Sequence, residues 1–179
     1  MTPIIGMTSS QHAFDQRFFR SALSRFPTGV TVIVAQDATG NPIGMTISSF
    51  NSLSLDPPLI LWTLKLESSS MPHMRKADGY VVHVLSESQQ ALAQRFARGP
   101  QHERFQGIPM KRSNSGLWML DTPDCSAWFV CHNHHQHEAG DHAIFIGAVS
   151  ECAWTDTPPL VYHSSRFHHQ APVADSVSN

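Results

Sequence analysis

Hydrophobic residues recur at helical spacing near the start of the chain. Between residues 14 and 26 they fall three or four positions apart, at Phe14, Phe18, Phe19, Ala22, Leu23 and Phe26. This pattern predicts an amphipathic helix, preceded by a Ser9-Ser10 pair that can cap it and ended by Pro27-Thr28-Gly29.

Extended patterns follow this helix. Residues 30–35 are rich in β-branched side chains, residues 37–41 are turn-forming types, and residues 43–50 are extended again, so we expect a hairpin. Residues 51–58 are polar and end in two prolines, which favours a loop. Residues 59–64 are apolar on both alternating faces and predict a buried central strand.

The rest of the chain adds more strands than helices. We expect short helices at 70–76 and 88–97 with a strand at 80–85 between them, and a surface excursion at 99–116. Further strands are expected at 117–121, 125–137 and 142–153, with a turn at Gly140-Asp141. Consecutive strands without βαβ alternation predict a mainly β fold, with an antiparallel sheet or barrel and a few short helices.

The length of the chain indicates its domain organisation, and its net charge argues against some classes of partner. A chain of 179 residues is expected to be one domain over 1–179, with a core at about 14–167 and flexible ends at 1–9 and 171–179. The chain has 12 Lys and Arg and 14 Asp and Glu. The resulting formal net charge of −2 gives no general attraction to nucleic acid or an anionic membrane.

The expected compartment is the cytoplasm. The N-terminus lacks the pattern of a signal peptide, and no stretch approaches the ~18 apolar residues of a membrane helix. The three cysteines, Cys125, Cys131 and Cys152, form neither an even disulfide framework nor a CxxC pair, which suits a reducing compartment.

Candidate chemistry begins with a hydroxyl-rich stretch at residues 44–58. No GxGxxG or phosphate-loop lysine motif occurs, so a Rossmann-type site is not expected. The stretch instead places Thr46, Ser48 and Ser49 beside free backbone amides, and such groups can bind the edge of a flat heteroaromatic ring or a phosphate. A plain serine-rich loop is the alternative interpretation.

Five motifs occur in an order that resembles a known family. They lie at residues 27–33 with 44–50 (PTGVTVI, GMTISSF), 54–59 (SLDPPL), 89–97 (Q-x-x-L-x-x-x-FA), 140–142 (GDH) and 159–162 (PLVY). Together they resemble the short-chain flavin reductases, which are the reductase components of two-component flavin-dependent monooxygenases. The resemblance implies an FMN-binding split β-barrel of Greek-key type and a homodimer with flavin near the subunit interface.

The resemblance also implies an activity. Members of this family are NAD(P)H:flavin oxidoreductases, in which NADH or NADPH delivers a hydride from nicotinamide C4 to N5 of FMN or FAD. The reduced flavin often leaves for a partner monooxygenase. Because the cofactors carry this chemistry, the protein needs only to bind and orient the two rings.

The residues carried over for flavin binding lie in three segments. The segment 42–46 would line the ring, Ser48 and Ser49 would approach the ribityl chain or phosphate, and Arg95 would supply a charged fork to the phosphate. For Phe96 a core role, for Lys65 a solvated strand end, and for Ser69 and Ser70 helix capping remain alternatives. The full flavin set is Gly44, Met45, Thr46, Ser48, Ser49, Thr63, Leu64, Lys65, Ser69, Ser70, Arg95 and Phe96.

The nicotinamide side rests on His142 and the closing segment. A neutral imidazole beside the flavin can orient the carboxamide, and His142 is the candidate for that role. Tyr162, His163, Ser164 and Ser165 match the family segment that approaches the dinucleotide. The family usually has glycine where this chain has Ser165, so the loop conformation can differ here.

A dense run of histidines supports a competing hypothesis. Between Cys131 and His142 lie His132, His134, His135, His137 and Glu138, and His132 and His134 would share one face of a strand. No CxxC or HExxH completes a coordination shell for zinc or iron, so no metal is expected. A non-catalytic flavin- or haem-binding protein of the same fold is the alternative function.

Overall fold

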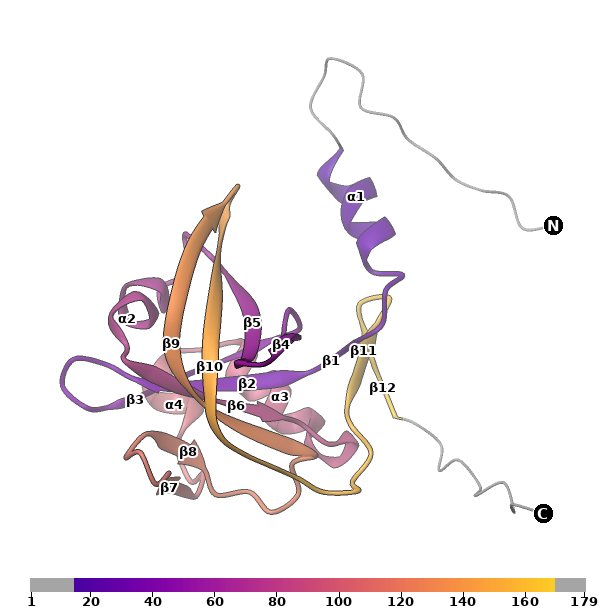
Figure 1. Ribbon diagram of the computed structural model, residues 1–179. Helices are drawn as coiled ribbons and strands as arrows, with labels where there is room; N and C mark the ends of the chain where they lie inside the picture. The colour runs from indigo at the N-terminus through magenta and orange to yellow at the C-terminus, as the bar shows by residue number, and fades with distance from the viewer. Residues whose placement is uncertain (1–14, 170–179) are drawn as a thin grey trace.

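The barrel is built from one curled antiparallel sheet. The computed structural model describes residues 15–169. Seven strands pair in the order β3-β2-β6-β9-β10-β5-β4 (Figure 1). They are β2 (Thr31–Gln36), β3 (Pro42–Ile47), β4 (Asn51–Leu55), β5 (Pro58–Lys65), β6 (Gly79–Val84), β9 (Ala127–Ala139) and β10 (His142–Trp154).

The connection between the two edge strands explains the curl. Strands β3 and β4 are opposite edges of the sheet, yet only residues 48–50 separate them in sequence. Such a connection spans at most roughly 14 Å, so the sheet must bend until its edges lie close together. The result is a barrel that is closed everywhere except at the seam between β3 and β4, and this confirms the mainly β, split-barrel expectation.

The barrel interior is filled by large side chains. The rings of Trp62 and Phe145 stack with centroids 4.4 Å apart, and the ring of Tyr80 meets Trp62 edge-on at 5.3 Å. All three residues are fully buried, together with Ile33 on β2. These contacts join β2, β5, β6 and β10 into one apolar core.

A second core lies outside the barrel. Because β2 alternates, Val32 and Val34 point away from the interior, where they pack with Phe96 of α3 (Gln90–Ala97) and with Leu85 and Leu160. This outer cover explains why β2 is buried on both faces, as a continuous apolar run predicts.

A buried histidine ties the outer hairpin to the barrel. The hairpin consists of β7 (Met110–Arg112) and β8 (Trp118–Leu120). His83 on β6 is fully buried, with Nδ1 3.3 Å from the Val32 carbonyl oxygen, and its Nε2 accepts a 3.1 Å hydrogen bond from the Leu120 amide. Burial lowers the pKa of His83 to about 4, so the ring is neutral, with its proton on Nδ1.

The remaining elements lie outside the seven-stranded sheet. A small sheet has the order β1-β11-β12, from β1 (Thr28–Gly29), β11 (Val161–His163) and β12 (Arg166–His168). Helix α1 (Gln16–Leu23) is capped by Asp15, has no buried residue and stands away from the barrel in Figure 1. The other short helices are α2 (Met71–Lys76), η1 (Glu87–Gln89) and α4 (Gln101–Arg104).

Most expected elements are confirmed, and one is wrong. The hairpin of β2 and β3, the strand at 59–64 (β5) and the Gly140 turn between β9 and β10 are present. Strand β5 is not central, because it lies next to the edge strand β4, and it is buried on one face only. The loop expected at 51–58 is instead strand β4, which pairs with β5 from Asn51↔Leu61 to Leu55↔Pro58. An edge strand pairs through its backbone, so its polar side chains misled the prediction.

Two expectations need a narrower statement. The excursion at 99–116 contains α4 and β7 and is therefore partly regular. Ser9-Ser10 and the flexible ends expected at 1–9 and 171–179 lie outside the described residues. Within residues 15–169, no helix combines the length and apolar character needed to cross a membrane.

Candidate functional site

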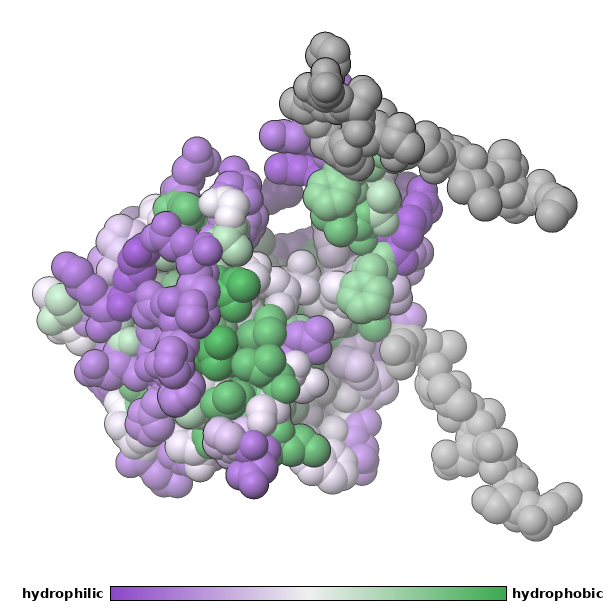
Figure 2. Space-filling view, turned by 45° about the horizontal axis from the view of Figure 1, so that its top comes forward, coloured by the Kyte–Doolittle hydropathy of each residue, from purple (hydrophilic) through white to green (hydrophobic). Residues whose placement is uncertain are grey.

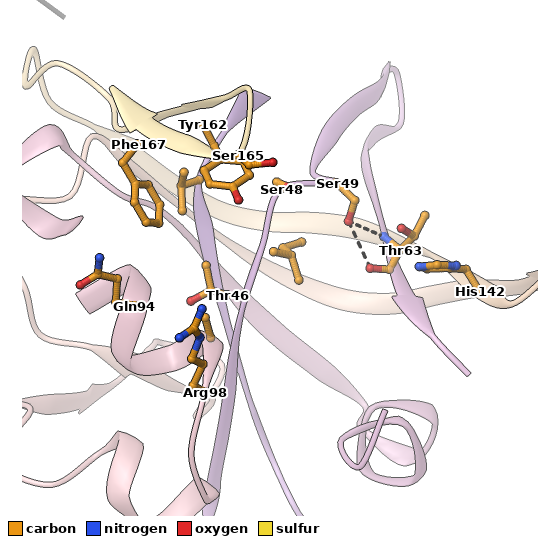
Figure 3. Close-up of a pocket in the computed structure, with 13 residues that line it drawn as sticks. Thr46, Ser48, Ser49, Thr63, Gln94, Arg98, His142, Tyr162, Ser165 and Phe167 are labelled. Atoms are coloured by element: carbon orange, nitrogen blue, oxygen red, sulfur yellow. Dashed lines mark hydrogen bonds between the residues drawn. The ribbon is translucent and has the colours of Figure 1, made fainter. Parts of the chain in front are cut away.

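The main pocket lies along the seam of the barrel. It has a volume of about 800 Å³ and is open to solvent on one side. Figure 3 shows side chains from the β3–β4 connection, β5, α3, β10 and the β11–β12 hairpin around it. Its lining comprises Val30, Thr46, Ile47, Ser48, Ser49, Thr63, Gln94, Ala97, Arg98, His142, Tyr162, Ser165 and Phe167.

Ser49 ties the β3–β4 connection to strand β5. Its hydroxyl donates to the Thr63 carbonyl at 3.1 Å and accepts from the Thr63 amide at 3.0 Å (Figure 3). These bonds extend the pairing with β5 past Asn51, the first residue of β4, which lies opposite Leu61. The Ser49 hydroxyl is therefore committed to the protein, and its role is to fix the shape of the pocket wall.

The other hydroxyls of this wall differ in how freely they can meet a ligand. Thr46 donates to the Ala93 carbonyl of α3 at 2.7 Å, which leaves its lone pairs as acceptors. Within the described part of the chain, no hydrogen bond is found for the exposed Ser48 hydroxyl. Ser48 can therefore donate or accept toward the pocket.

Aromatic rings from the small sheet form the opposite wall. The rings of Tyr162 on β11 and Phe167 on β12 lie 5.2 Å apart at an angle of 60°. Their hairpin turns at Ser164 and Ser165, whose φ angles of 49° and 61° are in the left-handed region. Ser165 thus keeps the backbone conformation that a glycine would adopt more easily.

His142 stands at the far end of the pocket, beside Thr63 in Figure 3. Its Nδ1 lies 2.6 Å from Oδ1 of Asp141, and because a carboxylate only accepts, Nδ1 carries the proton. This hydrogen bond lowers the pKa of Asp141. Nε2 of a neutral His142 is then an acceptor that can meet a ligand amide.

Arg98 is a pocket residue that the sequence did not indicate. It caps the C-terminal end of α3, directly after the helix motif, and lines the pocket with Gln94 and Ala97. Arg95, one helical turn earlier, donates instead to the carbonyls of Glu103 and Gln106. Helical periodicity predicts that Arg95 and Arg98 lie on neighbouring sides of α3. It could not show which guanidinium has no hydrogen-bond partner within the protein.

Several of the predicted flavin-binding residues lie outside the main pocket. Met45, Leu64 and Phe96 are buried in the core, and Ser70 is buried beneath Gln101, whose Nε2 donates to its hydroxyl at 3.1 Å. Lys65 is exposed and pairs with Glu67 at 3.3 Å, and Ser69 is exposed in the preceding turn. On the nicotinamide side, His163 and Ser164 flank the pocket without lining it.

Gly44 supports the pocket from behind. A Cβ on this residue would lie 2.6 Å from the Phe96 ring and 2.8 Å from the Phe105 ring. Its amide donates to Oε1 of Gln101 at 2.8 Å, and its carbonyl accepts from Arg104 at 2.6 Å. The glycine therefore lets α3 and α4 approach β3 closely enough to form one side of the site.

The histidine run lies on the protruding part of the β9–β10 hairpin. His135 and His137 share a face, with parallel rings 6.1 Å apart, and His134 lies beside His135. Among residues 15–169, no three His, Cys, Asp or Glu side chains are grouped as metal ligands would be. Cys125 and Cys131 are buried and Cys152 is exposed, and all three are free.

The arrangement suits a flat, polar-edged ligand. Hydroxyls and backbone groups line one wall, aromatic rings the other, and Arg98 supplies a formal charge. The pocket is lined by His142 but by no paired carboxylates for acid–base catalysis among the described residues. Such a site can bind and orient ring systems whose own chemistry does the work.

Comparisons with known proteins agree on one family. A model described as a flavin reductase like domain matches residues 23–171. The chain is 39% identical over 163 residues to the FMN reductase (NADH) SmoA of Agrobacterium fabrum, covering 88% of this chain and 91% of that protein. It is also 39% identical over 137 residues to the stachydrine N-demethylase reductase subunit Stc3 of Rhizobium meliloti, covering 76% of this chain but 58% of that one.

A solved structure shows the same fold. The NADH:FAD oxidoreductase SgcE6 of Streptomyces globisporus C-1027 superposes with a TM-score of 0.85 at 28% sequence identity. The match covers 96% of this chain and 100% of that one.

Proposed function

The chain belongs to the flavin reductase-like domain family, and we propose that it transfers a hydride from NADH or NADPH to FMN or FAD in the seam pocket. The single observation that supports this site most strongly is the meeting of a hydroxyl-lined wall, an aromatic wall and His142 around one cavity of about 800 Å³. That volume lies within the range of about 300–1,000 Å³ that is usual for small-molecule sites.

The donor set fits a flavin ring. An isoalloxazine presents carbonyl and imide groups along one edge, and the hydroxyls of Ser48 and Thr46 are neutral groups that can match them. Tyr162 and Phe167 can cover an aromatic ring system from the other side. A bound flavin supplies the hydride acceptor, and the chain's residues supply the shape and the hydrogen bonds.

His142 orients the hydride donor. With its proton held on Nδ1 by Asp141, the neutral ring presents an Nε2 lone pair to the carboxamide N–H of a nicotinamide. A hydride step needs no proton transfer, so the histidine acts by positioning alone. Tyr162 and Ser165 border the same space and would limit where the nicotinamide ring can lie.

The test is a paired measurement of turnover and binding. Purified protein with NADH or NADPH and added FMN or FAD should oxidise the dinucleotide and consume oxygen as reduced flavin reoxidises. His142→Ala should lower kcat/KM for the dinucleotide about tenfold while leaving the flavin Kd within twofold. The exposed His135→Ala is the matched control and should change neither value.

Two results would contradict this function. One is the absence of flavin-dependent NADH loss above a buffer control. The other is a visible spectrum that shows bound flavin or haem in a protein with no dehydrogenase activity. A non-catalytic carrier of the same fold would give this result.

We also propose that the product is reduced flavin for a partner monooxygenase. The similarity to a reductase subunit of a demethylase supports this role. The whole chain, 1–179, would act as one domain in the cytoplasm, where its three free cysteines stay reduced. Coupled product formation by a candidate oxygenase, with this protein as its only source of reduced flavin, would test the role.

The outer face of the sheet supports a homodimer. Leu61 lies opposite Ile146, and Leu59 lies opposite Ala148, so these side chains share the outer face of β5 and β10. Figure 2 shows hydrophobic side chains gathered in the middle of one face of the molecule. Pairing Thr63 with Ile144 continues this face into the pocket.

The dimer can be tested by its mass in solution. Leu61→Glu should convert a dimer into a monomer in light scattering, because a charge on a buried apolar interface is strongly unfavourable. Lys76→Glu on α2 is a matched control and should leave the mass unchanged. A monomeric unaltered protein at micromolar concentration would contradict the proposal.

A further inference from the structure

The protruding hairpin of β9 and β10 carries a row of exposed histidines. Figure 1 shows the end of this hairpin projecting beyond the neighbouring strands. We call His134, His135 and His137 the histidine row; all three side chains are exposed, and none of them lines the seam pocket. The row is therefore a surface feature that the proposed hydride transfer does not use.

A β-bulge explains why two sequence neighbours share a face. His135 pairs with Ile146 and Asn133 pairs with Gly147, so His134 is an extra residue without a partner on β10. A bulge re-aims the side chain of such a residue relative to the regular alternation of a strand. The rings of His134 and His135 accordingly have centroids 4.2 Å apart, although neighbours in a regular strand point to opposite faces.

The opposite face of β9 is fixed to helix α2. The Asn133 side chain donates to the Met74 and Ala77 carbonyls at 3.2 and 3.1 Å. The Gln136 side chain donates to the Arg75 carbonyl at 3.2 Å. These bonds commit the amide side chains to α2 and hold the strand in place, while the histidine row lies on the other face.

The imidazole nitrogens of the row are available to a ligand. Among the residues that the structure describes, no hydrogen bond or ion pair is found for the three side chains. A second close pair, His163 and His168, differs in this respect. Nε2 of His163 lies 3.3 Å from the Ser164 hydroxyl, and Nε2 of His168 lies 3.2 Å from the His163 carbonyl oxygen.

The spacing of the row suits a shared metal ion. Imidazole nitrogens bind zinc at about 2.1 Å, so two imidazoles on one tetrahedral ion have ring centroids roughly 5 Å apart. The rings of His135 and His137 are parallel with centroids 6.1 Å apart, and His134 lies nearer to His135. Rotation of these exposed side chains about their own bonds can bring two nitrogens to one ion without moving the backbone.

We propose that the histidine row binds one exchangeable divalent transition-metal ion through two imidazoles at a time, with His135 as the shared ligand. Three side chains do not converge as a complete shell within residues 15–169, so water would fill the remaining positions. Imidazole ligands favour copper, nickel and zinc over magnesium and calcium, with copper bound most tightly. The absence of CxxC and HExxH motifs predicted no metal, because sequence spacing does not reveal the bulge that groups the histidines.

The test is a zinc titration of the full chain, without an affinity tag, followed by calorimetry. The variants are His135→Ala, which removes the shared ligand, and His137→Ala, which leaves His134 and His135 as a pair. His168→Ala is the matched control, because it removes an exposed histidine from the second close pair. Circular dichroism checks that each variant is folded.

The expected losses follow the order of the ligands. The unaltered protein should bind one zinc ion per chain. His135→Ala should raise the zinc Kd by about tenfold or more, because the ion then loses the advantage of two linked ligands. His137→Ala should raise it by a smaller factor, and His168→Ala should leave it unchanged. Magnesium should not bind at the same concentrations, because the row offers no oxygen ligand.

Three results would overturn the metal site. They are the absence of zinc binding to the unaltered protein, unchanged zinc affinity in His135→Ala, and a loss in His168→Ala that is as large as the loss in His135→Ala. Magnesium binding as tight as that of zinc would also contradict imidazole ligands. The titration contains neither flavin nor dinucleotide, so its outcome does not depend on the proposed hydride transfer.

Discussion

The closed side of the barrel and its seam belong to one sheet, but the closed side is packed with side chains and the seam borders an open pocket. On the closed side, Trp62, Tyr80 and Phe145 fill the space between the strands. At the seam, the β3–β4 connection leaves a cavity bordered by hydroxyls and by the rings of Tyr162 and Phe167. The same backbone architecture thus provides stability on one side and binding on the other.

The difference teaches how the chain separates these two tasks. Interior rings lose water and pack closely, so each contributes to the free energy of unfolding. Seam residues keep their contact with solvent and are held by local bonds, such as those of Ser49 with Thr63. Substitutions on the closed side should therefore change stability, and substitutions at the seam should change affinity.

The largest expected effect is on the closed side. Trp62→Ala should lower the free energy of unfolding by about 3–5 kcal/mol, because it leaves a cavity beside Phe145 and Tyr80. Urea denaturation followed by circular dichroism measures this. Trp154→Ala is the matched control: that side chain is 74% exposed, and its loss should change stability by less than about 1 kcal/mol. Equal effects would erase the distinction.

We also expect the folding stability to depend on pH through a histidine of the packed region. His83 has a pKa of about 4 in the folded state and an ordinary value of 6.5 when unfolded. The unfolded chain binds the proton more tightly, so the stability from the neutral ring is present above pH 6.5 and is lost as the pH falls toward 4. The loss should reach about 3 kcal/mol.

The contribution of His83 can be separated from that of other histidines. Unfolding free energies of the unaltered protein and of His83→Gln should be measured between pH 7 and pH 4. The variant should be less stable at pH 7 and should lose less stability on acidification. Parallel pH profiles for the two proteins would show that the buried imidazole does not titrate as stated.

At the seam, a filled pocket should abolish binding without unfolding the protein. Ala97→Phe places a ring in the cavity from the exposed end of α3 and should raise the flavin Kd by roughly tenfold or more. Its effect on unfolding should stay within about 0.5 kcal/mol. Ala91→Phe, also exposed on α3 but outside this pocket, should leave flavin binding intact. Unchanged affinity in Ala97→Phe would place the ligand elsewhere.

The smallest expected effect is a gain in stability at the seam. Ser165 has a φ of 61°, so Ser165→Gly should remove backbone strain and raise the free energy of unfolding by about 1 kcal/mol or less. Ser150→Gly in the extended strand β10 should have the opposite sign, because glycine adds entropy to the unfolded chain and the Ser150 hydroxyl loses its 3.3 Å hydrogen bond to the Val130 carbonyl. If the strain were absent, the melting temperatures of both variants would shift in the same direction in thermal unfolding.

The periodic patterns predicted most of the fold. The apolar run at 59–64 became strand β5, and the Gly140-Asp141 dipeptide marked the β9–β10 turn. The strand was found because an apolar run of this length is typical of a strand, although only one of its faces is buried, and the turn was found because a positive φ favours glycine. The polar edge strand β4 was missed because backbone pairing leaves no trace in residue type.

The candidate site was predicted in part. Thr46, Ser48, Ser49, Thr63, His142, Tyr162 and Ser165 are brought to one pocket from distant parts of the chain. Arg98, Gln94 and Phe167 were not identified, because a residue's access to a cavity depends on what packs beside it. Met45, Leu64 and Phe96 adjoin pocket residues in sequence, yet their side chains point into the cores.

The sequence by itself determined the family motifs, the strand-rich fold and the hydroxyl-lined segment, since these depend on residue type and spacing along the chain. Only the tertiary structure decided which arginine is free. Arg95 and Arg98 are three residues apart on one helix, but the segment that follows folds back and offers carbonyls to Arg95 alone. The physical reason is that long-range packing assigns the hydrogen-bond partners, and a guanidinium without such partners is available to a ligand.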